Sequence, residues 1–225
     1  MSTIFPAVRA VGEGKGETIF YLTAKTITRT VAQEAFEVLR EKGMKYKVVT
    51  ITAKEKLCFM DETKCDPVHC PYARGHFDRV NDAVYELWTT KSRYDRETIR
   101  EQAEKWQVCP FEMCLDLSVW VDAVICDYNY VFDPTVHLKR FFGEGAGGDY
   151  IFLIDEAHNL AERGREMYSA SICREDAVRV RKVMKERAPR LYRSLGKLDK
   201  QLKELQVDCG NYLVLPGTGS ITMTI

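Results

Sequence analysis

The chain has 225 residues, 45% of them hydrophobic, with 33 basic and 33 acidic side chains. That hydrophobic fraction is ordinary for a globular protein, and no apolar run of roughly eighteen residues is present that would predict a membrane span. A formal net charge of zero argues against a uniformly basic protein that coats DNA. The first residues do not form a secretory signal, so a cytoplasmic, reducing compartment is expected.

The hydrophobic pattern at the start of the chain predicts helices alternating with strands. Residues 3–11 are expected to be helical, and Thr18–Thr23 to form a buried strand. The next predicted elements are a helix over Thr28–Lys42, ended by Gly43, and a β-branched strand over Tyr46–Thr52. The apolar face of that helix is expected to consist of Val31, Ala35, Phe36 and Leu39.

The following segment, Lys54 to Gly75, shows little periodicity. It is expected to be irregular, with a bound metal supplying its folding energy. Helices are predicted over Phe77–Thr89 and over Arg96–Trp106, the second capped by Asp95. A further helix is predicted over Phe111–Trp120.

The α/β pattern then resumes. Asp122–Cys126 predicts a strand, and Pro134–Phe142 predicts a helix with proline in its first turn. Tyr150–Ile154 is an unbroken apolar run after the glycine-rich residues 143–148. Such a run favours a strand buried on both faces of a parallel sheet.

Beyond Asn159 the chain is expected to be helical. Apolar residues at three-four spacing predict a helical seam, which Pro189 divides. The seam consists of Ala177, Val180, Met184, Leu191, Leu195, Leu198, Leu202 and Leu205. Residues 174–204 hold eleven Lys or Arg against five Asp or Glu, a charge of about +6 that indicates either a DNA-facing surface or a solvated helix face.

Asp155-Glu156-Ala157-His158 follows the apolar strand directly, where open α/β sheets bind their ligands. An aspartate there can hold the magnesium ion of a nucleotide, and a neighbouring glutamate can orient and deprotonate the attacking water. This pattern after a hydrophobic strand is typical of the second nucleotide-binding motif, Walker B, of superfamily-two helicases. The structural alternative is that the acids merely begin the next helix.

Four cysteines precede this strand: Cys58, Cys65, Cys70 and Cys109. Structural zinc usually has pairs of closely spaced cysteines, and only Cys65 and Cys70 approach that spacing. Four-thiolate ligation of an iron–sulfur cluster therefore fits better. The alternatives are a mixed zinc site with His69 and His76, four unrelated buried thiols, and Cys114 in place of Cys109 as the fourth ligand.

Together these features resemble the XPD–DinG (Rad3-like) family of iron–sulfur superfamily-two DNA helicases. The resemblance covers roughly residues 1–205, in the family's order. The stretches that carry it are Tyr21-Leu22-Thr23-Ala24-Lys25-Thr26, Lys56-Leu57-Cys58, Cys65, Cys70, Cys109-Pro110-Phe111, Cys126 to Pro134, and Leu153 to Leu160.

The resemblance implies an α/β fold with an incomplete RecA-like parallel-sheet motor domain, an inserted iron–sulfur domain and the start of a helical arch domain. The expected divisions are 1–53 and 116–165 for the motor, 54–115 for the inserted domain, 166–212 for the arch, and 213–225 for an unassigned tail.

The resemblance also implies cofactors and partners. The expected cofactors are ATP, Mg²⁺ and a [4Fe–4S] cluster on Cys58, Cys65, Cys70 and Cys109. Asp155 and Glu156 are the expected catalytic residues, and His158 is expected to couple the nucleotide site to neighbouring motifs.

Single-stranded DNA and duplex junctions are the expected partners, bound without sequence preference through Thr23, Lys25 and Thr26. Lys25 also fits a solvated loop lysine. Tyr128 and Tyr130 are expected either to stack on bases or to pack at the strand end. No membrane partner is expected, and the sequence identifies no protein partner.

The sequence contains no G-x-x-x-x-G-K-[ST] loop, which would cradle the nucleotide phosphates. In the stretch Gly12–Thr18, Gly16 follows the lysine, Arg9 stands at the first glycine position, and a strand comes after instead of before. The chain is therefore expected to begin just after the phosphate loop, to lack the second motor domain, and to be an inactive fragment of an ATP-dependent DNA helicase of repair or replication. The alternative is an iron–sulfur or zinc module that binds nucleic acid without hydrolysing ATP.

Overall fold

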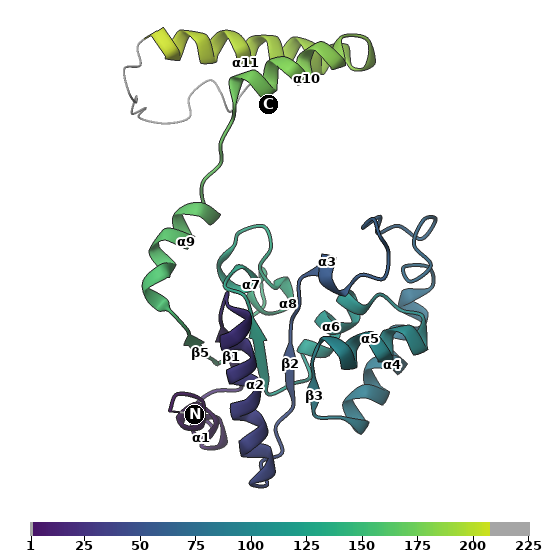
Figure 1. Ribbon diagram of the computed structural model, residues 1–225, viewed down its shortest axis with the longest axis vertical. Coiled ribbons are helices and arrows are strands. Elements are labelled where there is room, and N and C mark those ends of the chain that lie inside the picture. The colour runs from purple at the N-terminus through teal and green to yellow at the C-terminus, as the bar shows by residue number, and fades with distance from the viewer. Residues whose placement is uncertain (1, 208–225) are drawn as a thin grey trace. The chain divides into compact units, whose positions relative to one another are not determined.

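The computed structural model describes residues 2–207. The chain up to Tyr168 forms one compact unit, and a second begins at Ser169. The first is an α/β unit whose five parallel strands follow the order β3-β2-β4-β1-β5 (Figure 1). The predicted α/β class with a parallel sheet is thus confirmed.

The elements of the first unit agree with most of the predicted ones. The strands are β1 (Thr18–Leu22), β2 (Val48–Thr50), β3 (Arg93–Tyr94), β4 (Ala123–Cys126) and β5 (Tyr150–Ile154). The helices are α1 (Ile4–Gly12), α2 (Thr26–Glu41), α3 (Lys54–Leu57), α4 (His76–Thr90), α5 (Arg96–Trp106), α6 (Pro110–Ser118), α7 (Asn129–Phe132), α8 (Lys139–Phe142) and α9 (Leu160–Met167), with a 3-10 turn, η1, over Ala157–Asn159.

Helices cover both faces of the sheet because the side chains of each strand alternate. In β1, Ile19 packs into a core formed with α1 and α2. Its neighbours Phe20 and Leu22 point to the other face, into a core formed with α4, α5 and α6. This period of two is the geometry of a strand, and helices on both faces are the rule for parallel sheets.

The inner face of α2 differs by one residue from the predicted one. Ala35 and Phe36 are buried as predicted, but Val31 is 52% exposed and Ala32 occupies the inner position. Positions 32, 35, 36 and 39 form one helical stripe, and position 31 lies outside its edge, about 100° around the helix from position 32. The helix ends at Glu41, and Gly43, the predicted stop, follows its cap with a φ of 95° that favours glycine.

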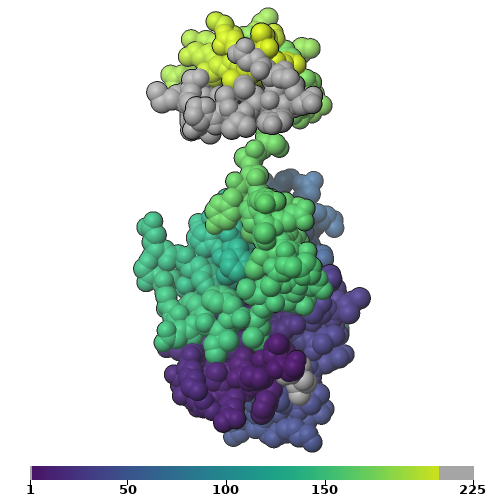
Figure 2. Space-filling model, turned by 90° about the vertical axis from the view of Figure 1, so that its left-hand side faces the viewer, coloured from purple at the N-terminus to yellow at the C-terminus, as the bar shows by residue number. Residues whose placement is uncertain are grey.

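The prediction that Tyr150–Ile154 is buried on both faces is wrong. Among the described residues, β5 pairs only with β1, so it is an edge strand, and Phe152 is 40% exposed. Its aromatic side chains instead pack in a cluster with Phe20. The centre of the Phe20 ring lies 5.3 Å from that of Tyr150 and 5.6 Å from that of Phe152. In Figure 2 the N-terminal segment (purple) lies against the segment that leads into β5 (green), where the Glu17 amide donates to the Asp149 carbonyl at 2.6 Å.

The predicted helix over Pro134–Phe142 is also wrong in its first half. Asp133 accepts hydrogen bonds from the amides of Thr135 at 2.7 Å and Val136 at 3.0 Å, which closes a turn where a helix was expected. Only Lys139–Phe142 is helical. The two-residue strand β3 was not predicted because it is too short to show a period.

The second unit is described up to Val207 and consists of α10 (Arg174–Arg187) and α11 (Pro189–Val207). The predicted division at Pro189 is confirmed. The two helices pack against each other, with Arg174 bound to Asp199 at 2.7 Å. Leu198 is buried in this seam, whereas other apolar side chains remain exposed, among them Val180 and Leu191. Cys209 and the predicted tail 213–225 lie outside the described residues.

No helix in the described part of the chain is long and apolar enough to cross a membrane.

Candidate functional site

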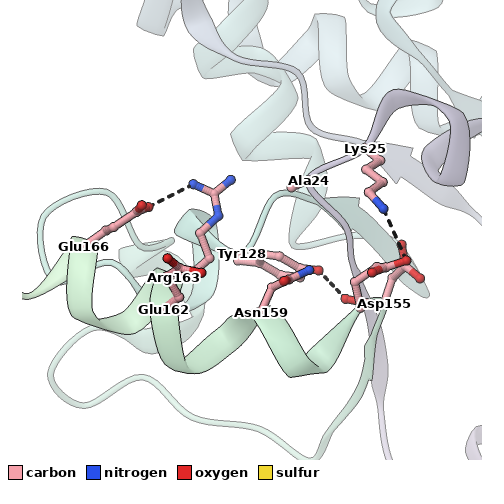
Figure 3. Close-up of a pocket in the computed structure, with 9 residues that line it drawn as sticks. Ala24, Lys25, Tyr128, Asp155, Asn159, Glu162, Arg163 and Glu166 are labelled. Atoms are coloured by element: carbon pink, nitrogen blue, oxygen red, sulfur yellow. Dashed lines mark hydrogen bonds and ion pairs between the residues drawn. The ribbon is translucent and has the colours of Figure 1, made fainter.

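Three adjacent strands place polar residues at one edge of the sheet. Because β4, β1 and β5 are parallel neighbours, the residues that follow them meet at their carboxyl ends. Residues from all three segments, including Lys25, Tyr128 and Asp155, line a cavity of about 400 Å³ (Figure 3). Asn159, at the end of η1, and the side of α9 that carries Glu162, Arg163 and Glu166 complete it.

Asp155 is fixed at three points. Its amide donates to the Leu22 carbonyl at 3.0 Å, its carboxylate accepts from the Thr23 hydroxyl at 3.1 Å, and its carbonyl accepts from the Tyr128 hydroxyl. Thr23 is fully buried, and its hydroxyl also accepts from the Lys25 amide at 3.2 Å. In this structure Thr23 therefore contacts Asp155, and its side chain is not exposed to solvent.

Glu156 has an unusual backbone conformation. Its φ is 51°, and the one other described non-glycine residue with positive φ is Gln107. A left-handed conformation costs roughly 1–2 kcal/mol for such a residue, so it persists only where the surroundings impose it. The Glu156 carboxylate lies 3.2 Å from the Lys25 ammonium and 3.3 Å from the His158 ring. His158 is 73% exposed in its side chain and does not line the cavity.

The cavity carries an excess of carboxylates. Its lining contains four acids, Asp155, Glu156, Glu162 and Glu166, against two bases, Lys25 and Arg163. Arg163 already pairs with Glu166 at 3.4 Å. Carboxylate oxygens in excess suit a hard cation such as Mg²⁺.

The tyrosines after β4 pack within the protein. Tyr128 is 2% exposed, and Tyr130 is also buried, so this conformation agrees with packing at the strand end and not with base stacking. Burial raises the pKa of Tyr128, and the nearby Asp155 raises it further. The Tyr128 hydroxyl therefore keeps its proton at neutral pH and can donate to Asp155.

The four predicted cysteine ligands line a single small cavity of about 30 Å³. Its other walls are mainly apolar, formed by residues such as Phe59, Met60, Tyr72 and Phe111, with no carboxylate and no histidine among them. A set of soft sulfur donors without oxygen donors fits a thiolate-bound metal. The thiols do not reach closed coordination geometry, however: among residues 2–207, no group of three or more Cys, His, Asp or Glu side chains is placed to hold a metal ion.

Charge near these thiols comes from Lys54. A hydrogen bond with Cys65 raises the pKa of Lys54, and its ammonium lies 5.6 Å from the centre of the Phe111 ring. Burial raises the pKa of the Cys109 thiol. A nearby ammonium favours the thiolate form that metals require.

The alternative ligands considered from the sequence lie elsewhere. His69 faces Asp66 at 2.8 Å, and the buried ring of His76 accepts a hydrogen bond from the Cys109 amide at 3.2 Å. Cys114 is fully buried outside the cysteine cavity, where burial raises its pKa to about 12. A mixed cysteine–histidine zinc site is therefore not assembled in the described residues.

A second large cavity, of about 880 Å³, was not predicted from the sequence. It lies beside the start of α2, where Thr26 lines it, and contains the acids Glu55 and Asp127. The basic side chains in its lining are Arg29, Lys54, Lys56, His137, Lys139 and Arg140. The Nε atom of Arg29 is buried without a hydrogen-bond partner. These bases come from three distant segments, so only the fold brings them together.

Known proteins resemble this chain in sequence and in fold. The DEAD_2 family profile matches residues 39–177. The Fanconi anemia group J protein homolog of Gallus gallus is 31% identical over 104 residues, which cover 46% of this chain and 8% of that protein. The solved structure of a truncated XPD matches with a TM-score of 0.57 and 20% identity, over 90% of this chain and 57% of that one.

The structural match establishes likeness of fold, and the stretch matched in sequence spans less than a tenth of the length of the curated relative. The family profile, by contrast, covers more than half of the 225 residues, including the acidic strand and all four predicted cysteine ligands. The chain belongs to the DEAD_2 family, the group of helicase motor regions that its motifs resemble.

Proposed function

We propose that this chain forms part of the motor of an ATP-dependent DNA helicase, in which Asp155 binds the magnesium ion of ATP and Glu156 orients the attacking water. The observation that carries the proposal is the fixation of Asp155 at three points beside the left-handed Glu156. Catalysis of phosphoryl transfer depends mainly on positioning and electrostatics, so two acids fixed at a ligand-binding edge support this function.

The basic cavity is the proposed contact surface for single-stranded DNA. Thr26, at the start of α2, and Arg29, whose Nε has no hydrogen-bond partner, suit phosphate groups. Lys25, which precedes Thr26 in the chain, lines the cavity that holds the acids. Contacts of this kind recognise the DNA backbone and not its sequence. Thr23, which was expected to contact DNA, is proposed instead to hold Asp155.

Cys58, Cys65, Cys70 and Cys109 are the proposed ligands of a [4Fe–4S] cluster. The support is their arrangement around one mainly apolar cavity, together with Lys54 beside Cys65. When bound, the cluster would supply metal–thiolate bonds that fold the irregular segment before α4. We further propose that an inserted domain comprises residues 54–115. The start of a helical arch domain is proposed to comprise residues 166–212.

Hydrolysis requires a phosphate loop, and the stretch Gly12–Thr18 does not supply one. It forms a turn between α1 and β1, at the amino end of β1, opposite the edge that carries Asp155. The 225-residue chain alone is therefore expected to show no ATP hydrolysis. Binding of nucleic acid without hydrolysis, the second candidate function, remains consistent with this turn.

One experiment separates the two functions. We expect DNA-stimulated ATP hydrolysis from a protein in which a phosphate loop precedes this chain and a second motor domain follows it. Glu156→Gln in that protein should abolish hydrolysis and retain ATP binding. Absence of hydrolysis in the extended protein, with DNA binding intact, would instead support the non-hydrolysing module. Hydrolysis that survives Glu156→Gln would contradict the role of Glu156.

A further inference from the structure

The backbone at Glu156, just after the Asp155–Glu156 peptide, has a left-handed conformation that residues other than glycine rarely adopt. β5 ends at Ile154, and two residues later Glu156 adopts the left-handed conformation before η1 begins. This turn decides where the Glu156 carboxylate points, because a rotation of the preceding peptide would carry the side chain away from the cavity. Strained conformations of this kind persist only where neighbouring contacts determine them.

The contact on that peptide comes from Tyr128. Its hydroxyl donates to the carbonyl of Asp155, across the gap between the loop after β4 and the end of β5 (Figure 3). The tyrosine is itself held in place, because it is 2% exposed and packs in the larger hydrophobic core. A buried ring that carries one hydroxyl onto a backbone carbonyl acts as a fixed support for that peptide.

We infer that Tyr128 is a positioning residue for hydrolysis, which holds the Asp155–Glu156 peptide so that the Glu156 carboxylate faces the nucleotide cavity. Tyr128 touches neither nucleotide nor water in this role and acts only through Glu156. The inference rests on the proposed function of Glu156 as the residue that orients water.

A tyrosine elsewhere in the same core provides a matched control. Tyr94, on β3, is also buried in this core. Its hydroxyl donates to the Lys91 carbonyl at 2.7 Å, and Tyr94 lines neither the acidic nor the basic cavity. Replacement of either tyrosine by phenylalanine removes one hydroxyl and keeps the ring, so a difference between the two variants reports on the Tyr128 hydroxyl.

The test compares Tyr128→Phe and Tyr94→Phe in the extended protein that hydrolyses ATP. Misplacement of a catalytic group by about 1 Å can cost on the order of a hundredfold in rate. We therefore expect Tyr128→Phe to lower kcat by about ten- to a hundredfold, with KM for ATP and affinity for single-stranded DNA unchanged. Tyr94→Phe should keep the wild-type kcat. Circular dichroism of both variants should show the same thermal midpoint as the wild type, to within a few degrees.

Two results would overturn the inference. One is a kcat of Tyr128→Phe close to that of the wild type, and the other is an equal loss in Tyr94→Phe, which would indicate a general effect on the core in place of the hydroxyl contact. A change in KM alone would likewise assign Tyr128 to nucleotide binding and overturn it. Failure of the proposed function is distinguishable, because it appears as hydrolysis that survives Glu156→Gln.

Discussion

The Lys25 ammonium lies 3.2 Å from the carboxylate of Glu156, so the residue expected to contact DNA is paired with the residue expected to orient water. Both side chains are partly exposed, and pairs of this kind contribute only about 0–1 kcal/mol. A DNA phosphate can therefore replace Glu156 as the partner of Lys25 at little cost. In the proposed motor, this exchange would link binding of the strand directly to the acid proposed to orient water.

The first prediction concerns Lys25→Gln. We expect weaker binding of a single-stranded oligonucleotide, because one phosphate contact is lost, and a slope of log affinity against log salt that is smaller by about one. Fluorescence anisotropy between about 50 and 200 mM salt measures this slope. Lys15→Gln is the control, since Lys15 pairs with Glu13 in the turn before β1. Equal slopes for the wild type and Lys25→Gln would remove Lys25 from the DNA surface.

The second prediction concerns the buried hydroxyl of Thr23. Thr23→Val keeps the shape of the side chain but removes the donor to Asp155 and the acceptor for the Lys25 amide. Because a buried group left without its partner costs about 1–3 kcal/mol, we expect a loss of that size in the free energy of unfolding. Thr23→Ser, which retains the hydroxyl, should lose less. Urea unfolding measures both, and a Thr23→Val variant as stable as the wild type would contradict the assigned contact.

The third prediction concerns metal at the cysteine cavity. Protein purified without oxygen is expected to be brown and to contain about four irons per chain. Replacement of Cys58, Cys65, Cys70 or Cys109 by serine should lose the metal. Cys173→Ser should retain it, because Cys173 is an exposed thiol in the second unit. Elemental analysis that finds one zinc and no iron would exclude the cluster.

The fourth prediction concerns stability in acid. The Glu86 carboxylate accepts hydrogen bonds from Lys105, from the Trp106 ring at 2.6 Å and from Gln102 at 3.0 Å, which lower its pKa to about 2. Since the folded pKa lies below the ordinary value of 4.5, this stabilisation is present above pH 4.5 and is lost as the pH falls toward 2.

Glu86→Gln is therefore expected to lower the thermal midpoint at neutral pH and to lose less stability than the wild type as the pH falls from about 4.5 to about 2. Glu104→Gln on α5 is the control, because Glu104 is exposed and its carboxylate forms no ion pair in the described part of the chain. Parallel pH curves for the wild type and Glu86→Gln would show that Glu86 does not carry this dependence.

The sequence predicted those elements whose ends are set by nearby residues, such as a capping side chain or a proline. The Asp95 side chain caps α5 through the Thr98 amide at 3.0 Å, and α11 begins at Pro189, both as expected. The acidic pair was found for the same reason, since it directly follows an apolar strand. The parallel sheet followed from the alternation of strands and helices.

Features that depend on neighbours in space were not accessible from local patterns. An apolar run such as Tyr150–Ile154 has the same composition in the middle of a sheet as at its edge, and only strand order separates the two cases. The contact between Tyr128 and Asp155 joins residues 27 positions apart in the sequence. The turn at Asp133 was missed because proline at position 134 is compatible with both a helix start and a turn.

The position of β5 has a consequence for the acids that follow it. One side of this strand has no neighbouring strand among the described residues, so its outward amides and carbonyls are available to another strand. Asp155 and Glu156 thus extend from an edge strand of the sheet. Any polypeptide that added a strand along this side would stiffen the base of the turn that carries them, and the completeness of the sheet would set how firmly the acids are held.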